Sequence, residues 1–327
     1  MGPSLVVGLL AAVTACVAAA QTRPTDSTQP YPSKPLHFVV GFPPGGNSDF
    51  VARAIGRGLS EAWGQQVIVD NRPGAGGNIA AEVVAKAPPD GYTLLLAVFA
   101  HAVNPSLYRK LPFDAINDFS PVILCTSAAN ILVVHPSLPA KSVQGLIALA
   151  KAKPGAVTYA SAGNGTASHL AGELLRMMSG IDIVHVPYRG TGPAHTDLMG
   201  GRVTTFFAAM AGTLPHVQTG RLRALAVTTL KRWPGAKDVQ TMAEAGLPGF
   251  EVNSWSGLMA PAGTPKEIIA RLNTEVARIV RTPEARERFY SFGAEPIDNT
   301  PDEFAAYVNA EFVKWAKVVK SAGLRAE

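Results

Sequence analysis

Four glycine-rich segments have the clearest capacity for chemistry in this sequence. They are residues 42–49 (FPPGGNSD), 72–78 (RPGAGGN), 161–169 (SAGNGTASH) and 188–193 (YRGTGP). Each follows a short apolar run and precedes a helical pattern, so we expect each to connect a strand to a helix. Glycine lets a backbone approach a ligand closely, and a helix start presents unpaired N–H groups with partial positive charge. Such turns can bind a carboxylate or phosphate without Lys or Arg.

The position of these turns favours binding over simple connection. A single glycine turn is more often only a connection, but two in each half of the chain, all at strand ends, predict a cleft with anion-binding walls on both sides. None matches the nucleotide motifs G-x-G-x-x-G or G-x-x-x-x-G-K-[ST]. Asp49 is expected to cap the first turn of its helix, although it could instead accept a ligand hydroxyl or ammonium.

Enzymatic and metal chemistry are weaker interpretations. Ser161, His169 and Asp197 could form a hydrolase triad, but no G-x-S-x-G elbow is present. The 7 His residues show no H-x-x-x-H or H-E-x-x-H spacing. His169, in a first helical turn, could be a cap or a ligand donor, and the thiol of Cys125 is expected in the core. We therefore expect no enzymatic activity, no cofactor and no metal.

Composition limits the class of protein. The 327 residues indicate two domains or one large one, and 47% hydrophobic with 16% charged residues excludes a disordered chain, a collagen repeat or a coiled coil. The net charge of +5 comes from scattered Lys and Arg without a basic run, so nucleic acid is not an expected partner.

The start of the chain resembles an export signal. Residues 1–20 carry no charged side chain and contain an apolar stretch too short to span a bilayer comfortably, ending in small residues before Gln21. This predicts a signal peptide over 1–20, a flexible tether over 21–32 and a periplasmic protein. An alternative is a lipoprotein signal in which Cys16 is acylated as the first mature residue.

The body alternates short apolar runs with amphipathic runs, which is typical of an α/β protein with mainly parallel sheets. Strands are expected at 36–40, 67–69, 93–98, 121–125, 131–134, 157–160, 183–186, 203–208 and 224–228. Helices are expected at 48–63, 78–86, 142–153, 167–178, 193–199 and 301–321, with Thr264 and Thr300 as matching N-caps of two late helices. The interruption between 125 and 131 is a candidate crossing between domains. The last helix is expected to pack back on the first domain.

From about residue 31 onward the sequence resembles the Bug-type periplasmic solute-binding proteins of tripartite tricarboxylate transporter systems. The segments that carry the resemblance are FPPGG with Asp49, VDNRPGAGG (69–77), PDGYTL (89–94), NPSLY (104–108), GNGTASHL (163–170), VPYRG (186–190), DLMGG (197–201) and LRALAV (222–227). The resemblance implies a two-lobed Venus-flytrap fold, with lobe 1 at 33–124 and 254–327 and lobe 2 at 125–253. It also implies a small organic acid as ligand, membrane transporter subunits as partners, and a monomer.

The resemblance also suggests which residues bind the ligand, partly through main-chain amides and water. The expected ligand-binding residues are Phe42, Pro44, Gly45, Gly46, Ser48, Asp49, Ala75, Gly76, Asn78, His101, Ser161, Gly163, Gly165, Thr166, His169 and Tyr188.

Two questions stay open at this level. Many relatives have a polar pair after Phe206-Phe207, where this chain has Ala208-Ala209-Met210. If that segment faces the cleft, an apolar wall favours a monocarboxylate or aromatic acid. A sensor that reports ligand to a membrane signalling partner would use the same fold and site.

Overall fold

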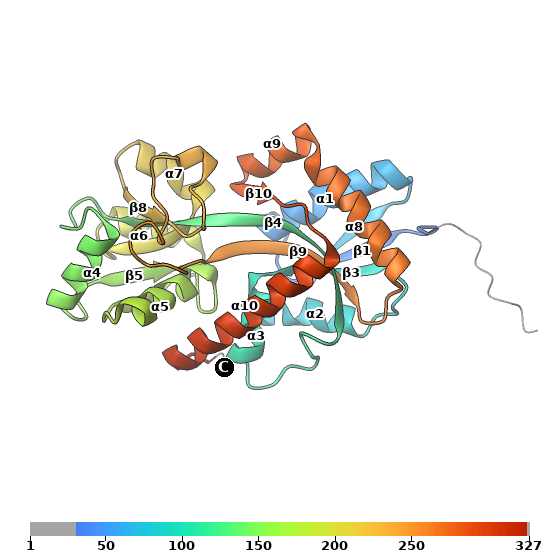
Figure 1. Cartoon of the computed structure of the whole chain (residues 1–327), viewed down its shortest axis with the longest axis horizontal. Helices are drawn as coiled ribbons and strands as arrows, with labels where there is room; N and C mark the ends of the chain where they lie inside the picture. Colours follow the sequence, from blue (N-terminus) through green and yellow to red (C-terminus); the bar gives the residue numbers. More distant parts are fainter. Residues whose placement is uncertain (1–30, 326–327) are drawn as a thin grey trace, which may run out of the picture. The chain divides into compact units, whose positions relative to one another are not determined.

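The strands form a mixed sheet in which two long strands, β4 and β9, lie at the centre (Figure 1). The computed structural model describes residues 31–325, and in this part of the chain the strand order is β2-β1-β3-β9-β4-β7-β5-β6, with β8 and β10 also paired to β4. The strands are β1 Leu36–Val40, β2 Val67–Asn71, β3 Thr93–Val98, β4 Phe119–Val134, β5 Thr158–Ser161, β6 Val184–Pro187, β7 Thr205–Ala209, β8 Arg223–Val227, β9 Asn253–Pro261 and β10 Ala294–Pro296. The predicted signal peptide and most of the tether lie outside the described residues.

Strand β4 belongs to two halves of the sheet. Its residues 119–129 pair with β9 and β10, whereas 130–134 pair with β7 and β8. We call β1, β2, β3, β9 and β10 the first sheet half, and β5 to β8 the second. The expected α/β class is confirmed, but the sheet is mixed rather than mainly parallel. The reason is that β4 runs from the first half to the second and β9 returns, so these two strands are antiparallel.

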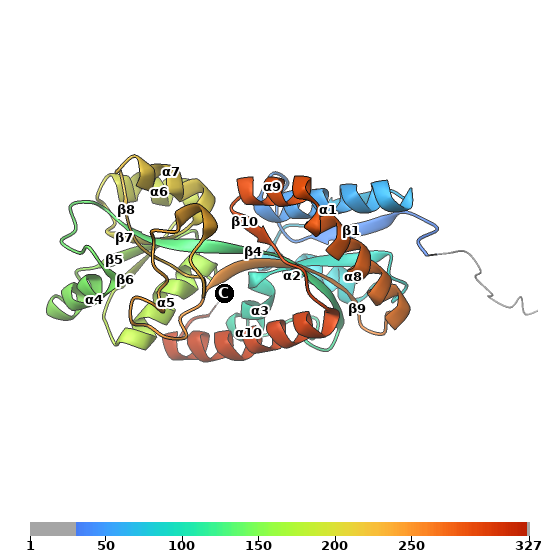
Figure 2. The same cartoon turned by 45° about the horizontal axis from the view of Figure 1, so that its top comes forward.

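Helices cover both faces of each half. The α-helices are α1 Asn47–Trp63, α2 Asn78–Ala85, α3 Phe99–Leu107, α4 Val143–Ala152, α5 Ala167–Ser179, α6 Thr191–Met199, α7 Met210–Gln218, α8 Lys266–Arg281, α9 Pro283–Ser291 and α10 Pro301–Ala322, with short 3₁₀ turns η1 Ala75–Gly77 and η2 Pro234–Ala236. In the first half α1 and α8 pack together on one face, and α2 and α3 lie on the other (Figure 2). In the second half α5 and α6 pack against β5 and β7, and α7 against β4 and β7.

Helix α10 joins the two halves. It packs on α3, as the sequence predicts for contact with the first domain, and it also reaches α5. The buried carboxylate of Glu311 accepts hydrogen bonds from Trp255 Nε1 of β9 (3.2 Å) and from Trp315 Nε1 (2.9 Å). Because Trp315 lies in α10 itself, the charge-assisted bond from Trp255 is the one that ties α10 to β9.

Six elements differ from the sequence-based expectation. Strand β4 is continuous where a break is expected, and α3, α7, α9, β9 and β10 are additional. The small and polar residues at the expected break are buried: Ala129 packs in the core, and the Asn130 amides donate to Thr228 and to the Val252 carbonyl. Pairing with distant segments therefore overrides the local polar pattern. The cap at Thr264 is also wrong, because its hydroxyl donates to the Pro261 carbonyl and Pro265 is the N-cap residue of α8.

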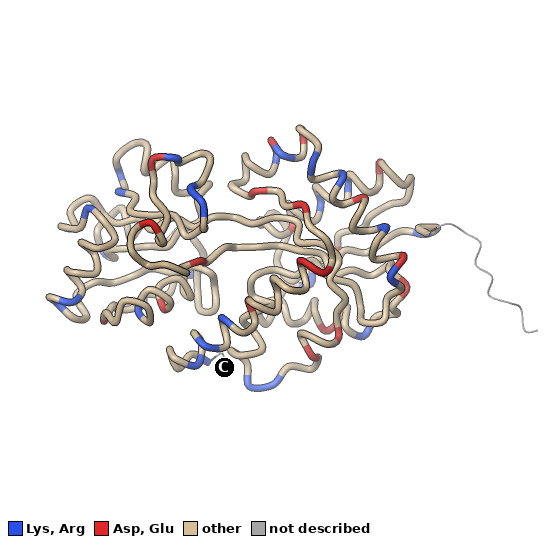
Figure 3. Tube along the Cα trace, in the orientation of Figure 1, with Lys and Arg blue, Asp and Glu red and all other residues tan. Residues whose placement is uncertain are grey.

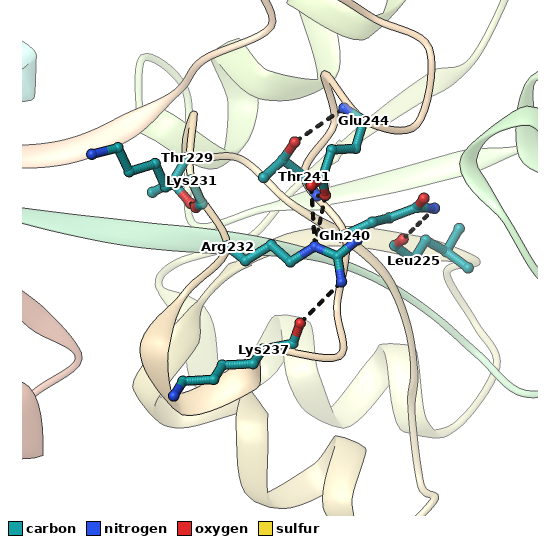
Figure 4. A network of polar contacts seen from close by, with 8 residues as sticks. All are labelled: Leu225, Thr229, Lys231, Arg232, Lys237, Gln240, Thr241 and Glu244. Carbon is teal, nitrogen blue, oxygen red and sulfur yellow. Dashed lines mark hydrogen bonds and ion pairs between the residues drawn. The ribbon is translucent and has the colours of Figure 1, made fainter.

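The irregular segment between β8 and β9 is held by its own polar contacts (Figure 4). Arg232 forms an ion pair with Glu244 at 2.8 Å and donates to the Lys237 carbonyl at 3.1 Å, while Glu244 accepts from the Thr241 N–H at 2.8 Å.

Elsewhere Lys and Arg are distributed over both halves, alternating with Asp and Glu (Figure 3). This distribution agrees with the absence of a basic run in the sequence.

The cap of α10 predicts a measurable loss of stability on truncation. Thr300 Oγ1 accepts from the Glu303 N–H, and Glu303 accepts from the Thr300 N–H at 2.7 Å, which is a complete capping box. We expect Thr300→Ala to lower the free energy of unfolding by about 1 kcal/mol in urea titrations. Thr300→Ser keeps the hydroxyl and is the matched control. Equal stability of the two variants would contradict the role of the cap.

Candidate functional site

The four glycine-rich turns all lie at carboxyl ends of parallel strands, as predicted. The first two follow β1 and β2, which pair with each other, and the other two follow β5 and β6, which also pair. Within the first pair, Asn71 Nδ2 donates to the Phe42 carbonyl at 3.0 Å. Within the second, the Gly190 N–H donates to the Ala162 carbonyl at 3.1 Å. Each sheet half therefore presents two adjacent turns.

The turn after β1 leaves the start of α1 uncapped. Its N-cap residue, Gly46, is extended at φ −81° and ψ 174°, and no side-chain hydrogen bond caps the helix. The N–H groups of Asn47, Ser48 and Asp49 precede the first intrahelical bond, from the Phe50 N–H to the Gly46 carbonyl at 2.9 Å. Such N–H groups need acceptors from outside the helix and carry the positive end of its dipole.

Asp49 holds this turn, but it does not cap the helix as the sequence predicts, because it accepts from the N–H of Gly45, which precedes the N-cap residue. One oxygen accepts from the Gly45 N–H at 2.9 Å and Arg53 Nε at 3.0 Å, and the other accepts from Asn71 Nδ2 at 3.1 Å. Burial alone would raise the pKa of Asp49, but these hydrogen bonds outweigh it and hold that pKa below its ordinary value. The carboxylate therefore stays ionised and its charge is offset by Arg53.

The turn after β5 is built in the same way but is more enclosed. Thr166 is the N-cap residue of α5, again without a side-chain cap, and Gly165 is buried at φ +75°. The Gly165 N–H donates to His169 Nδ1 at 3.1 Å, and Thr166 Oγ1 donates to the Gly163 carbonyl at 2.6 Å. The N–H groups of residues 167–169 are left at the start of the helix without intrahelical acceptors.

Two stacked histidine rings, those of His169 and His185, support this second turn. The rings of His169 and His185 are 4.0 Å apart and nearly parallel, at 8°, and Tyr159 stacks on His185 at 4.8 Å. A 2.6 Å hydrogen bond joins His185 Nε2 to Ser161 Oγ. Burial lowers the pKa of both imidazoles to about 4, so both are neutral at pH 7.

The remaining two turns are held by side chains of neighbouring elements. The turn after β2 contains Ala75, the one non-glycine residue with positive φ (47°) in the described chain. Asn104 of α3 donates to the Gly76 carbonyl at 3.0 Å and to Asn78 Oδ1 at 2.7 Å. A cavity of about 20 Å³ beside them has room for about one water molecule. In the turn after β6, the Tyr188 hydroxyl donates to Asp197 at 2.9 Å.

Helix α3 contacts turns of both sheet halves. Its Asn104 holds the Gly76 turn, and one turn further along Leu107 meets the Gly165 turn, where an added Cβ would lie 2.8 Å from Leu107 Cδ2. The sequence pattern does not predict this helix. Its Asn104, together with Asn71 and His185, supports the turns from other elements. Asn71 and Asn104 lie in the segments VDNRPGAGG and NPSLY that carry the family resemblance, but none of the three is among the expected ligand-binding residues.

His101 and Ser161 occupy supporting positions. His101 Nε2 bonds to the Ala115 carbonyl at 3.0 Å among Phe113, Phe119 and Phe312, although it also borders the small cavity. Ser161 is fully buried. The imagined hydrolase triad is not assembled, because Ser161 bonds to His185 and Asp197 pairs with Arg202 at 2.7 Å.

Of the residues expected to form an apolar wall, 208–210, only Ala209 exposes its methyl group. Ala208 and Met210 are buried in the core of the second half, and only Ala209 between them is exposed. Both faces of β7 are covered, and the exposed Ala209 is the last residue of the strand, immediately before α7 begins at Met210. The segment therefore gives little support for selecting an aromatic acid.

The fold and its paired turns are those of the two-lobed periplasmic binding proteins. Residues 51–324 match the family described as the tripartite tricarboxylate transporter family receptor, and the chain belongs to this family. It is similar to the protein BugT of Bordetella pertussis, with 38% identity over 97% of this chain and 98% of that protein. The Bug-type resemblance is thereby confirmed, and the family consists of solute-binding receptors rather than enzymes.

Two solved structures with bound acids are also similar. Rpa4515 of R. palustris with adipate has a TM-score of 0.77 and 41% identity, covering 90% of this chain and 99% of that one. MatC from Rhodopseudomonas palustris with bound malate has a TM-score of 0.73 and 34% identity, covering 88% and 100%. In the described part of this chain, no helix is long and apolar enough to cross a membrane.

Buried imidazoles predict that stability falls in acid. Burial lowers the pKa of His101, His169 and His185 to about 4 from an ordinary value of 6.5, so between these values the unfolded chain binds more protons than the folded one. The contribution of the neutral rings is complete above pH 6.5 and is lost as pH falls toward 4. Each tenfold difference in proton affinity corresponds to about 1.4 kcal/mol.

This prediction is checked by urea unfolding midpoints between about pH 7 and 4.5. His101→Gln is the matched variant, because its amide can still donate to the Ala115 carbonyl but does not titrate. We expect a shallower pH dependence for this variant, by about one proton. A midpoint that does not change over this range, or an unchanged slope in the variant, would contradict it.

Proposed function

We propose that this protein binds a small organic carboxylate at the uncapped starts of α1 and α5 and delivers it to the membrane subunits of a tripartite tricarboxylate-type transporter. The observation that carries the proposal is the pair of helix starts, one in each sheet half, whose first N–H groups have no side-chain cap. In each turn the neighbouring polar groups are already satisfied by one another. The free donors are thus presented to an external anion.

The donors differ in part from those expected from the sequence. The N–H groups of Gly45 and Gly165 bond to Asp49 and His169, so these glycines shape their turns instead of donating. We propose that the ligand is held by amides of residues 46–48 and 167–169, with the other predicted residues lining or supporting the two turns.

The energies are sufficient for a receptor. A hydrogen bond to a charged group contributes about 1.5–3 kcal/mol, and micromolar affinity requires about 8 kcal/mol. Three to four such bonds, with the helix dipoles of about 0.3–1 kcal/mol each, reach this value in order of magnitude. No basic side chain is needed, in agreement with the scattered distribution of Lys and Arg.

The ligand class follows from the same chemistry. Amides at a helix start recognise a carboxylate group and do not select the rest of the molecule. The similar proteins Rpa4515 and MatC contain adipate and malate, so dicarboxylates head the list of candidates here. A calorimetric panel of adipate, malate, succinate, citrate, nicotinate and benzoate separates them from aromatic acids.

The family also supports a proposal for where and how the protein works. We propose a monomer exported to the periplasm by cleavage after Ala20 or by acylation of Cys16. Its lobes, 33–124 with 254–327 and 125–253, close on the ligand. Motion between them would bend β4, the strand that pairs within both halves.

Removing single amide donors tests the site. Asn47 and Ala167 are the first residues of α1 and α5, and the residues before them are extended, with ψ 174° and 160°. Proline fits such positions and removes only an N–H. We expect Asn47→Pro and Ala167→Pro each to weaken binding of adipate or malate by about tenfold or more, measured by calorimetry, with little change in unfolding temperature.

Lys266→Pro provides the matched control. Lys266 is the first residue of α8 and follows an extended Pro265. Because β9 is antiparallel to β3, this helix begins at the opposite edge of the sheet from the turns. We expect unchanged affinity. Full binding by both site variants would refute the proposed donors, and no binding of any acid by the unmodified protein would refute the ligand class.

A further inference from the structure

The two turns share one detail of construction although they come from different sheet halves. In each, a glycine with positive φ precedes the N-cap residue, at φ +82° for Gly45 and +75° for Gly165. In each, the side chain four residues later accepts that glycine's N–H, at 2.9 Å for Asp49 and 3.1 Å for His169. We call this contact the turn lock.

The lock determines where the next amides lie. The Gly165 N–H is buried, and a buried N–H without an acceptor is strongly unfavourable, so the acceptor at position 169 decides whether the turn holds its shape. The following N–H groups, of residues 167–169, belong to the same rigid corner. Their direction therefore depends on a group that need not touch the ligand.

The two locks differ in charge. Asp49 is a carboxylate whose charge is offset by Arg53. His169 has Nδ1 as an acceptor, which places its proton on Nε2 and makes the ring neutral. The carboxylate of Glu173, which is also in α5, is paired with Arg176 at 3.0 Å and accepts from the Tyr159 hydroxyl. Within residues 31–325, no Lys or Arg forms a hydrogen bond or ion pair with His169. A carboxylate at this position would therefore lack a counter-charge.

We propose that His169 is a positioning residue whose Nδ1 atom fixes the α5 amides while adding no negative charge beside the bound anion. The second part of this inference, which concerns charge beside a bound anion, rests on the proposed function. The ring is held for this task by its stack with His185, which also bonds to Ser161 at the other end of the same turn. Both ends of the turn thus depend on one pair of neutral imidazoles.

The lock itself is tested without any ligand. In ¹⁵N-labelled protein at pH 7, we expect His169 to show an unprotonated Nδ1 and a protonated Nε2. Hydrogen exchange of the Gly165 N–H should be about tenfold faster or more in His169→Ala, and within about threefold of the unmodified rate in His169→Asn. Asparagine places a carbonyl oxygen near the position of Nδ1. A proton on Nδ1, or equal exchange in all three proteins, would overturn the lock.

Binding distinguishes positioning from direct contact. With adipate and malate as probes, we expect His169→Ala and His169→Gln to lose about tenfold or more in affinity, and His169→Asn to stay within about threefold. His169→Asp keeps an acceptor but adds charge, so it should bind more weakly than His169→Asn. Retained binding in His169→Gln with loss in His169→Asn would show that Nε2 contacts the ligand and would overturn the proposal.

The turn lock and the proposed function can be refuted independently of each other. If the exchange and tautomer results hold while the unmodified protein binds neither acid, the lock stands and the proposed ligand is wrong. If the unmodified protein binds an acid and His169→Ala binds it equally well, the proposed function stands and the positioning role is wrong. Each variant must show one cooperative unfolding transition that lies above the assay temperature, which controls for loss of fold while allowing the destabilisation expected when the Gly165 N–H loses its acceptor.

Discussion

Backbone N–H groups that no side chain caps, at the starts of α1 and α5, are the constraint on which the rest of the structure depends. A helix start leaves its first N–H groups without partners, and most helices satisfy some of them with Ser, Thr, Asp or Asn. Here the N-cap residues are Gly46 and Thr166, and neither side chain makes that bond. Thr166 instead uses its hydroxyl on the Gly163 carbonyl. These two helix starts therefore lack the stabilisation that a side-chain cap would give. Their first N–H groups stay available to an acceptor from outside the helix.

Keeping these donors free requires that everything around them be satisfied. Asp49 accepts three hydrogen bonds, Ser168 accepts from the Ala162 N–H, and the His169–His185 stack holds the second turn. Charges near both turns are paired or absent, because Asp49 is offset by Arg53 and the histidines are neutral. The positive potential at the site therefore comes from helix dipoles rather than from basic side chains.

The long elements relate the turns of one half to those of the other. Strand β4 passes through both halves of the sheet, and α10 packs on α3 and α5 together. Helix α3 holds the Gly76 turn through Asn104 and meets the Gly165 turn through Leu107. A shift of one half would be felt in these shared elements, since close-packed interiors transmit displacement instead of absorbing it. The turns of the two halves are thus mechanically connected through these shared elements.

The sequence by itself determined the α/β class, the four glycine turns at strand ends, the helices that follow them and the capping box at Thr300. These features depend on short-range chemistry: glycine's freedom at positive φ, hydrophobic periodicity and local capping. Tertiary structure alone decided that β4 is continuous, that Ser161 pairs with His185 rather than His169, and that Ala208 and Met210 face the core. It also decided which amides stay free, since Gly45 and Gly165 lie in the predicted turns but their N–H groups are occupied by Asp49 and His169. The reason is physical: a hydrogen bond or a buried contact between distant residues depends on how the elements pack, and no local pattern encodes that packing.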